Sequence, residues 1–146
     1  EQETARLRQL QRQLAQLLAS VPGLRLTGPS DLEQRLPHHL SYCTAAIPGH
    51  VLVREMSRQG IAISAGSACS SGQRIPSRIL LAMGYSEAEA LGSIRLSLGK
   101  ATTQAAVEQV ARSLQALLRS AAGSLEGQAT QPLPSAPAAE LAAGLR

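Results

Sequence analysis

The sequence predicts an α/β layer fold, in which a small sheet is covered by helices. Hydrophobic residues recur at helical spacing in 3–20 and in 103–120, which predicts an amphipathic helix at each end of the folded part. Apolar and polar residues alternate strictly in 92–99, as expected for a strand with one buried face. A chain of 146 residues is long enough for one domain with a substantial core and too short for two comfortable ones.

The first half of the chain alternates between helices and short strands. The helix over 3–20 ends at Pro22 and Gly23, and Pro48 suits the start of a second helix over 50–59. Three short segments have the length and composition of strands: 24–28, 39–46 and 61–64. The last of them runs directly into a stretch of small residues.

The second half contains two short helices, a strand and the long final helix. Pro76 opens a helix over 77–83, and Ser86 with Glu89 forms a capping-box pattern for the next one. The strand over 92–99 places two sets of residues on opposite faces: Ile94, Leu96 and Leu98 on one, Ser93, Arg95 and Ser97 on the other.

The composition changes near residue 121, where Ala, Gly, Pro and Ser begin to dominate. Pro132, Pro134 and Pro137 follow closely, and such a segment buries too little apolar surface to order itself. We therefore expect a folded domain over 1–120 and a mobile tail over 121–146.

Composition and charge narrow the classes of function. The hydrophobic fraction is 44%, but Phe and Trp are absent, so the core must be aliphatic. The formal charge of +4 comes from basic residues that are spread along the chain, which argues against a nucleic-acid site with clustered basic and aromatic side chains. No uninterrupted apolar stretch approaches the length of a membrane-spanning helix.

Two cysteines, Cys43 and Cys69, are too few for a disulfide framework and fit a reducing cytosol. A single disulfide between them remains open. His38 and His39 lie close to Cys43, but neighbouring side chains in an extended segment point to opposite faces, and no fourth ligand is evident. We therefore expect no metal site, and Cys43 fits a small core residue.

Cys69 stands in a stretch, SAGSACSSG at 64–72, that otherwise holds only Ser, Gly and Ala. Three residues in and after it disfavour regular structure: Gly66, Gly72 and Pro76. One interpretation is an exposed loop that carries a reactive thiol, whose pKa Arg74 and Arg78 would lower if they approached it. The other is a Ser/Gly linker that happens to contain a cysteine. Composition alone favours neither.

Three blocks in order, SAGSACSSG, PSRILLAMG and GSIRLSLGKATT, resemble the C-terminal part of the cysteine desulfurases of the class V aminotransferase family. LPHHLS and IPGHVLVREM fit the segment before them, so the resemblance covers about residues 3–120. It implies the small C-terminal domain of a fold-type I enzyme that uses pyridoxal phosphate, with a short, mainly antiparallel sheet.

The resemblance also implies an activity and roles for two residues. The family removes sulfur from L-cysteine, leaving L-alanine and a persulfide on the loop cysteine, here Cys69. The arginine that binds the substrate carboxylate corresponds to Arg95. The alternation of 92–99 independently places Arg95 opposite the apolar face, and the alternative is an arginine that is merely solvated. The implied partners are sulfur-acceptor proteins such as an iron–sulfur scaffold, with the intact enzyme a homodimer in the cytoplasm.

Several features depart from the family pattern. The lysine that holds pyridoxal phosphate belongs to an upstream block, and Lys100, the single lysine here, stands in another context. No phosphate-binding loop is evident, so we expect the cofactor to be bound by a domain upstream of Glu1 and this chain alone to be inactive. Ala65 replaces a usual Ser, His50 a usual Glu, and TTQAA the usual Thr-Thr-Glu.

Two alternatives stay open. A stand-alone persulfide carrier, or another non-catalytic binding module, would need only the loop thiol. A related class V aminotransferase or a selenocysteine lyase would share the fold, although a plain aminotransferase needs no thiol at Cys69. The choice between sulfur and selenium is not readable from these residues.

Overall fold

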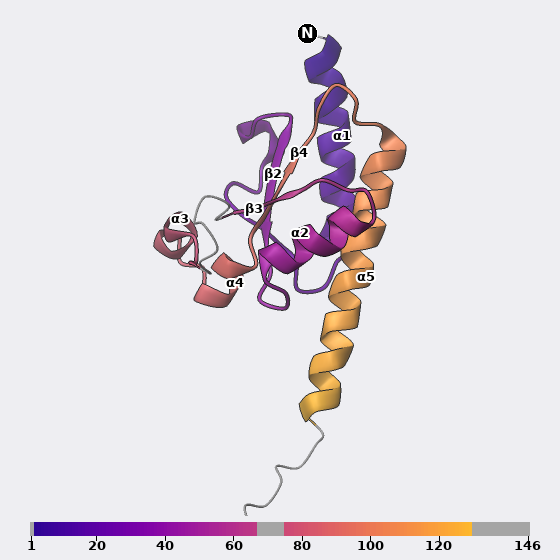
Figure 1. Ribbon diagram of the computed structural model, residues 1–146. Coiled ribbons are helices and arrows are strands. Elements are labelled where there is room, and N and C mark those ends of the chain that lie inside the picture. Colours follow the sequence, from indigo (N-terminus) through magenta and orange to yellow (C-terminus); the bar gives the residue numbers. More distant parts are fainter. Residues whose placement is uncertain (1, 67–74, 130–146) are drawn as a thin grey trace, which may run out of the picture.

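The computed structural model describes residues 2–66 and 75–129, which form an antiparallel sheet with helices packed on it (Figure 1). Four strands make the sheet, in the order β1-β2-β4-β3. Their bounds are Arg25–Leu26 for β1, His39–Cys43 for β2, Ser64–Ala65 for β3 and Ile94–Ser97 for β4. Every neighbouring pair is antiparallel, so the expected fold class is confirmed.

The helices gather mainly on one face of this sheet. α1 and α5 lie side by side and α2 packs near them, whereas α3 and α4 lie on the other side of the strands (Figure 1). The bounds are Gln2–Ala19 for α1, Gly49–Arg58 for α2, Arg78–Ala82 for α3, Glu87–Leu91 for α4 and Gln104–Ala129 for α5. A short 3₁₀ helix, Leu32–Gln34, follows β1.

The core lies between the sheet and these helices and is almost wholly aliphatic, as expected. Ile94 and Leu96 of β4 are buried in it, while Arg95 and Ser97 on the same strand are exposed, which confirms the predicted alternation. The same buried cluster includes residues of one other strand, β2, and of three helices, α1, α2 and α5: Leu40, Tyr42, Leu14, Leu18, Leu52, Met56, Leu114 and Leu118. Leucines at helical spacing thus bury one stripe of α1 and one of α5.

Ser93, expected on the same face as Arg95, is buried there. It lines a hollow together with Arg95, but only 2% of it is exposed, and it precedes the first residue of β4. Its hydroxyl donates to the carbonyl oxygen of Ala90, at 2.9 Å, which satisfies the buried polar group.

Side-chain caps fix the starts of three helices. Ser86 and Glu89 form the expected capping box of α4. The Ser77 hydroxyl accepts the backbone N–H of Leu80 at the start of α3, and Thr103 does the same for Ala106 of α5. The start of α5 therefore keeps a cap although TTQAA lacks the usual glutamate.

All four strands are shorter than the sequence predicted, and α5 is longer. Around the predicted strand over 61–64, only Ser64–Ala65 pairs, because Ile61 and Ile63 are buried or half-buried against the core without joining the ladder. α5 continues to Ala129 instead of ending near residue 120, since no proline interrupts it before Pro132. The expected tail beyond residue 129 lies outside the described residues.

No helix in the described segments is both long enough and apolar enough to cross a lipid bilayer.

Replacing Leu14 by Ala should lower the free energy of unfolding by about 2–5 kcal/mol, because its side chain is 1% exposed and would leave a cavity. Leu17, one turn further along α1, is 38% exposed, and Leu17→Ala should cost less than about 1 kcal/mol. Urea unfolding followed by circular dichroism measures both. Equal losses for the two variants would contradict the packing described for α1.

Candidate functional site

The face of the sheet opposite α1 and α5 carries polar side chains. Ser41 of β2 pairs with Arg95 of β4, and Ser64 of β3 pairs with Arg95 from the other side. Directly paired residues in a sheet project to the same face, so these three side chains lie together. Arg95 thus lies between Ser41 and Ser64 on the face of the sheet that α1 and α5 do not cover.

A hollow of about 400 Å³ lies on this face. It is lined by residues of β2 and β4, the β1–β2 connection, the residue after β3, the residue before β4, and α3 with its two flanking residues: Thr27, Gly28, Pro29, Arg35, Leu36, His39, Ser41, Gly66, Ser77, Ile79, Leu80, Met83, Ser93 and Arg95. We call it the Arg95 hollow. No acidic residue is among these lining residues. Three apolar side chains, Leu36, Ile79 and Met83, are largely exposed there.

Positive charge dominates the Arg95 hollow. Within the described segments, no ion pair joins Arg95 to a carboxylate. The pKa of His39 lies below its ordinary value, because burial disfavours the charged imidazole and because Arg95 and Arg35 repel a further positive charge. An uncharged imidazole beside two guanidinium groups makes a site suited to an anion.

The two arginines of the Arg95 hollow differ in their surroundings. The Arg35 guanidinium donates to two backbone carbonyl oxygens, that of Pro29 at 2.7 Å and that of Thr27. Arg8 in turn donates to the carbonyl oxygen of Arg35 at 2.9 Å. These hydrogen bonds use the Arg35 guanidinium to stabilise the β1–β2 connection. Arg95 is therefore the better candidate to bind a ligand.

Cys69, the predicted nucleophile, lies outside the described residues, as does Arg74. The described chain stops at Gly66 and resumes at Ile75, and both Gly66 and Ser77 line the Arg95 hollow. The segment that carries Cys69 therefore leaves and rejoins the described fold beside Arg95. Arg78 is exposed at the start of α3.

Cys43, the second cysteine, is a free thiol and is fully buried on β2. Burial raises the pKa of its thiol, and the nearby Glu89 carboxylate raises it further. A thiol with a raised pKa and no access to solvent is a poor nucleophile, which agrees with a packing role. Among the described residues, no cluster of three His, Cys, Asp or Glu side chains is arranged to hold a metal ion.

The residues of the Arg95 hollow do not provide a site for pyridoxal phosphate. Lys100, the only lysine of the chain, is exposed in the turn after β4 and does not line the hollow. Its carbonyl oxygen, with those of Gly99 and Thr102, accepts hydrogen bonds from the Arg6 guanidinium, so this turn is held by α1. No amine of the hollow is available to hold an aldehyde cofactor.

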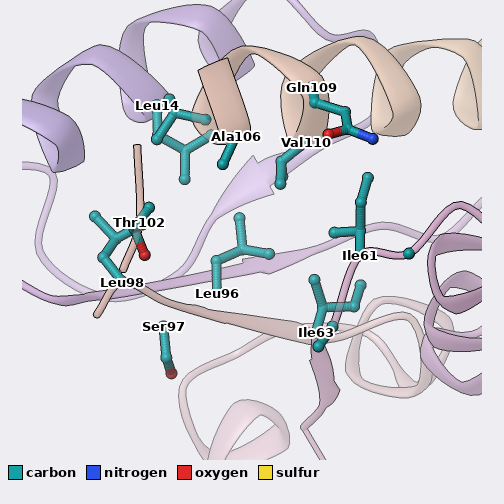
Figure 2. Close-up of a pocket in the computed structure, with 13 residues that line it drawn as sticks. Leu14, Ile61, Ile63, Leu96, Ser97, Leu98, Thr102, Ala106, Gln109 and Val110 are labelled. Carbon is teal, nitrogen blue, oxygen red and sulfur yellow. The ribbon is translucent and has the colours of Figure 1, made fainter. Parts of the chain in front are cut away.

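A second hollow, of about 210 Å³, lies between the start of α5, the end of β4 and the segment before β3. Figure 2 shows Ile61, Ile63, Leu96 and Val110 converging on it from these elements. No charged side chain lines it, so it lacks the chemistry of the Arg95 hollow.

The sequence pattern indicates Arg95 but not its neighbours in the hollow. It brings His39 forward only as a possible metal ligand and gives no role to Arg35 or Ser41. Ser41 lies two residues from His39 on β2, so strand alternation was the available signal for both. Nothing in the sequence pattern indicates Arg35, because the hydrogen bonds that place it depend on the turn at 27–29.

Comparison with known proteins finds one family and relatives named cysteine desulfurases. The family described as Aminotransferase class-V matches residues 1–110. The chain is 36% identical over 101 residues to the "Cysteine desulfurase IscS" of Clostridium botulinum, covering 69% of this chain and 25% of the relative. It is 38% identical over 109 residues to the "IscS-like cysteine desulfurase" of Mycobacterium tuberculosis, covering 74% and 28%. The chain thus spans about a quarter of the length of these relatives.

Solved structures show the same fold. A "NifS-like protein" superposes with a TM-score of 0.65 and 28% sequence identity, over 81% of this chain and 29% of that one. A NifS-like protein from Rickettsia africae superposes with a TM-score of 0.66 over 80% of this chain and 29% of that one. Its identity of 22% supports the fold alone.

Replacing Arg95 by Gln should raise the pKa of His39, because the change removes a positive charge that now opposes protonation of the imidazole. An NMR titration of the histidine side chains measures the shift. Arg112→Gln is the control, since Arg112 is exposed on α5 and pairs with Glu108. A His39 pKa that does not respond to Arg95→Gln would contradict the electrostatics of the hollow.

Proposed function

Because the chain belongs to the class V aminotransferase family, we propose that it is the part of a cysteine desulfurase that supplies Cys69 and Arg95. The reaction is the transfer of sulfur from L-cysteine to Cys69, which yields L-alanine and a persulfide. One observation carries the proposal: the segment that bears Cys69 leaves the fold and rejoins it beside an arginine in a hollow without acidic residues.

Arg95 binds the carboxylate of the substrate in this proposal. A guanidinium can donate two parallel hydrogen bonds to a carboxylate, which fix the orientation of the amino acid as well as its position. Because β4 is the third strand in the order β1-β2-β4-β3, Arg95 is held between two neighbours, Ser41 and Ser64. The exposed apolar residues at the rim reduce the water around the bound ion pair, which strengthens it.

Cys69 acts as the nucleophile. Its thiolate attacks the sulfur of L-cysteine, so that a sulfur–sulfur bond forms and the carbon–sulfur bond of the substrate breaks. The electron pair of the broken bond remains with carbon, which takes a proton to give L-alanine. One thiol and one cysteine are thus converted into one persulfide and one alanine, with no outside oxidant. The persulfide sulfur is then available to an acceptor thiol.

The rest of the proposal concerns what this chain does not provide. Pyridoxal phosphate is the cofactor that the family implies, and its lysine belongs to another part of the intact protein, since Lys100 lies away from the Arg95 hollow. We propose that the intact enzyme is a cytoplasmic homodimer and that its partners are sulfur-acceptor proteins, such as the scaffold on which iron–sulfur clusters form.

Replacing Cys69 by Ser in the intact enzyme should abolish the release of alanine from cysteine, because a hydroxyl cannot accept the substrate sulfur. Cys43→Ser is the matched control: that thiol is buried away from solvent, so alanine release should continue. Alanine is quantified by chromatography after incubation with cysteine. Undiminished release by Cys69→Ser would refute the role of the thiol.

Replacing Arg95 by Ala should raise KM for cysteine about tenfold or more, because two charge-assisted hydrogen bonds to the carboxylate are lost. Arg112→Ala, which removes an exposed arginine on α5, should leave KM unchanged. Steady-state kinetics of the intact enzyme measure both. An unchanged KM for Arg95→Ala would make Arg95 an ordinary solvated strand residue.

A further inference from the structure

The connection between β1 and β2, residues 27–38, makes one wall of the Arg95 hollow. It brings Arg35 to the lining, and His39 follows at the start of β2. Its backbone is hydrogen-bonded to neighbouring strands at its two ends and closes short turns in between. The middle of this wall therefore depends on side chains for its position relative to the sheet.

Gln11 is a fully buried polar residue beside the buried leucines of α1. Its Nε2 donates to the carbonyl oxygen of Leu36 at 2.7 Å and to that of His39 at 3.0 Å. Its Oε1 accepts a hydrogen bond from the Arg8 guanidinium at 3.2 Å. A side-chain amide that uses both its donor and its acceptor end in this way is held in one orientation. Gln11 thus ties α1 to the end of the wall that meets β2.

Arg8 holds the same wall from one turn earlier on α1. Its guanidinium donates to the carbonyl oxygen of Leu32 at 2.7 Å and to that of Arg35 at 2.9 Å. The Arg8 side chain is only 19% exposed, so these bonds are partly shielded from water, which strengthens them. Arg12 adds an ion pair with Glu33, but both side chains are more than half exposed, so that pair contributes little. Arg8 and Gln11 are therefore the main attachment of the wall to α1.

Arg35 connects this attachment to the charge of the hollow. Its carbonyl oxygen accepts a hydrogen bond from Arg8, while its guanidinium donates to carbonyl oxygens at the start of the wall. Its positive charge is one of those that oppose protonation of His39. A movement of the backbone at Arg35 would therefore change the charge that a ligand of Arg95 meets.

We propose that Arg8 and Gln11 are positioning residues for the Arg95 hollow, because they fix the wall that presents Arg35 and His39 to a ligand. This inference rests on the proposed function for the identity of the ligand, an amino acid held by its carboxylate. Neither positioning residue lines the hollow, so both act through backbone carbonyl groups of the wall. A looser wall would admit water to the bound carboxylate and weaken its ion pair, so substrate affinity is the property that they affect.

Kinetics of the intact enzyme test the positioning role through Gln11→Met. The thioether keeps the size of the side chain but has no N–H group to donate to the wall. KM for cysteine should rise about threefold to thirtyfold, the range expected for residues that act on a site through a network. The value of kcat should stay within about threefold, since no group that touches the substrate has changed. Gln16→Met makes the same change at an exposed position of α1 and should leave KM unchanged.

Two further variants separate positioning from stability. Leu14→Ala removes core packing from the same helix but no hydrogen bond to the wall, so it should lower the melting temperature and leave KM unchanged. Arg8→Lys keeps the charge but loses the guanidinium that reaches two carbonyl oxygens at once, so KM should rise. Arg8→Lys carries the test if Gln11→Met does not fold. An equal rise in KM for Leu14→Ala would overturn the inference, because loss of stability alone would then explain the effect.

A second readout, the titration of His39, does not depend on turnover. Gln11→Met changes no charge, so a change in the pKa of His39 would come from movement of the wall. A looser wall lets water reach the imidazole and separates it from Arg35, and both changes should raise the pKa of His39 toward its ordinary value. NMR of the intact enzyme labelled at histidine measures the shift, with the His39 signal assigned from His39→Asn. Gln16→Met should leave this titration unchanged.

The two readouts separate failure of this inference from failure of the proposed function. Wild-type enzyme that releases no alanine from cysteine would refute the function, while a His39 pKa raised by Gln11→Met would still support the positioning of the wall. Normal alanine release, with KM and the His39 pKa both unchanged in folded Gln11→Met and Arg8→Lys, would refute the positioning role and leave the function standing. In an active enzyme, a change in only one of the two readouts would also overturn it, because the inference requires the wall to move and the affinity to fall together.

Discussion

The position of Arg95 on the exposed face of the sheet depends on the burial of two side chains on the other face, Ile94 and Leu96. Each is almost wholly enclosed by α1, α2 and α5, and full burial of such a side chain is worth about 1.5–3 kcal/mol. Because side chains alternate along a strand, this burial forces Arg95 onto the opposite face. A shift of one residue in register would bury Arg95 and expose both apolar neighbours, so the register of β4 is strongly fixed.

The same constraint assembles the rest of the site. Pairing with β4 brings Ser41 and Ser64 beside Arg95, and continuation of that pairing brings Gly66 to Ser93. The helices that stabilise the sheet thus position the polar face without touching it. Arg35 adds positive charge to this face while its guanidinium holds the backbone at Thr27 and Pro29. The proposed site for a carboxylate therefore lies on strands that are stabilised by packing on the opposite face of the sheet.

Local sequence signals predicted much of this structure. The leucine spacing of α1, the capping box of α4 and the alternation in β4 each depend only on residues close together in the sequence, so each could be predicted. The end of α5 was missed because Ala and Ser suit both helices and tails, and only Pro132 marks a firm limit. The strand over 61–64 was placed too early because β-branched residues such as Ile61 fill a core as readily as they pair.

The site was predictable only in part. Arg95 could be found because alternation and a family resemblance point to the same residue. His39 and Arg35 join it through strand register and backbone hydrogen bonds between distant segments, and single-sequence patterns carry no such information. The close contact of Gly66 with Ser93 is likewise a property of the paired strands, although a glycine beside a strand end gives a weak hint.

The most direct test of the central claim is mass spectrometry of the two cysteine-containing peptides after the intact enzyme has reacted with L-cysteine. Sulfur transfer to Cys69 predicts one additional sulfur atom on the peptide that carries Cys69 and none on the peptide that carries Cys43. Alanine release with no sulfur gained by Cys69 would contradict the claim that this thiol receives the sulfur of the substrate.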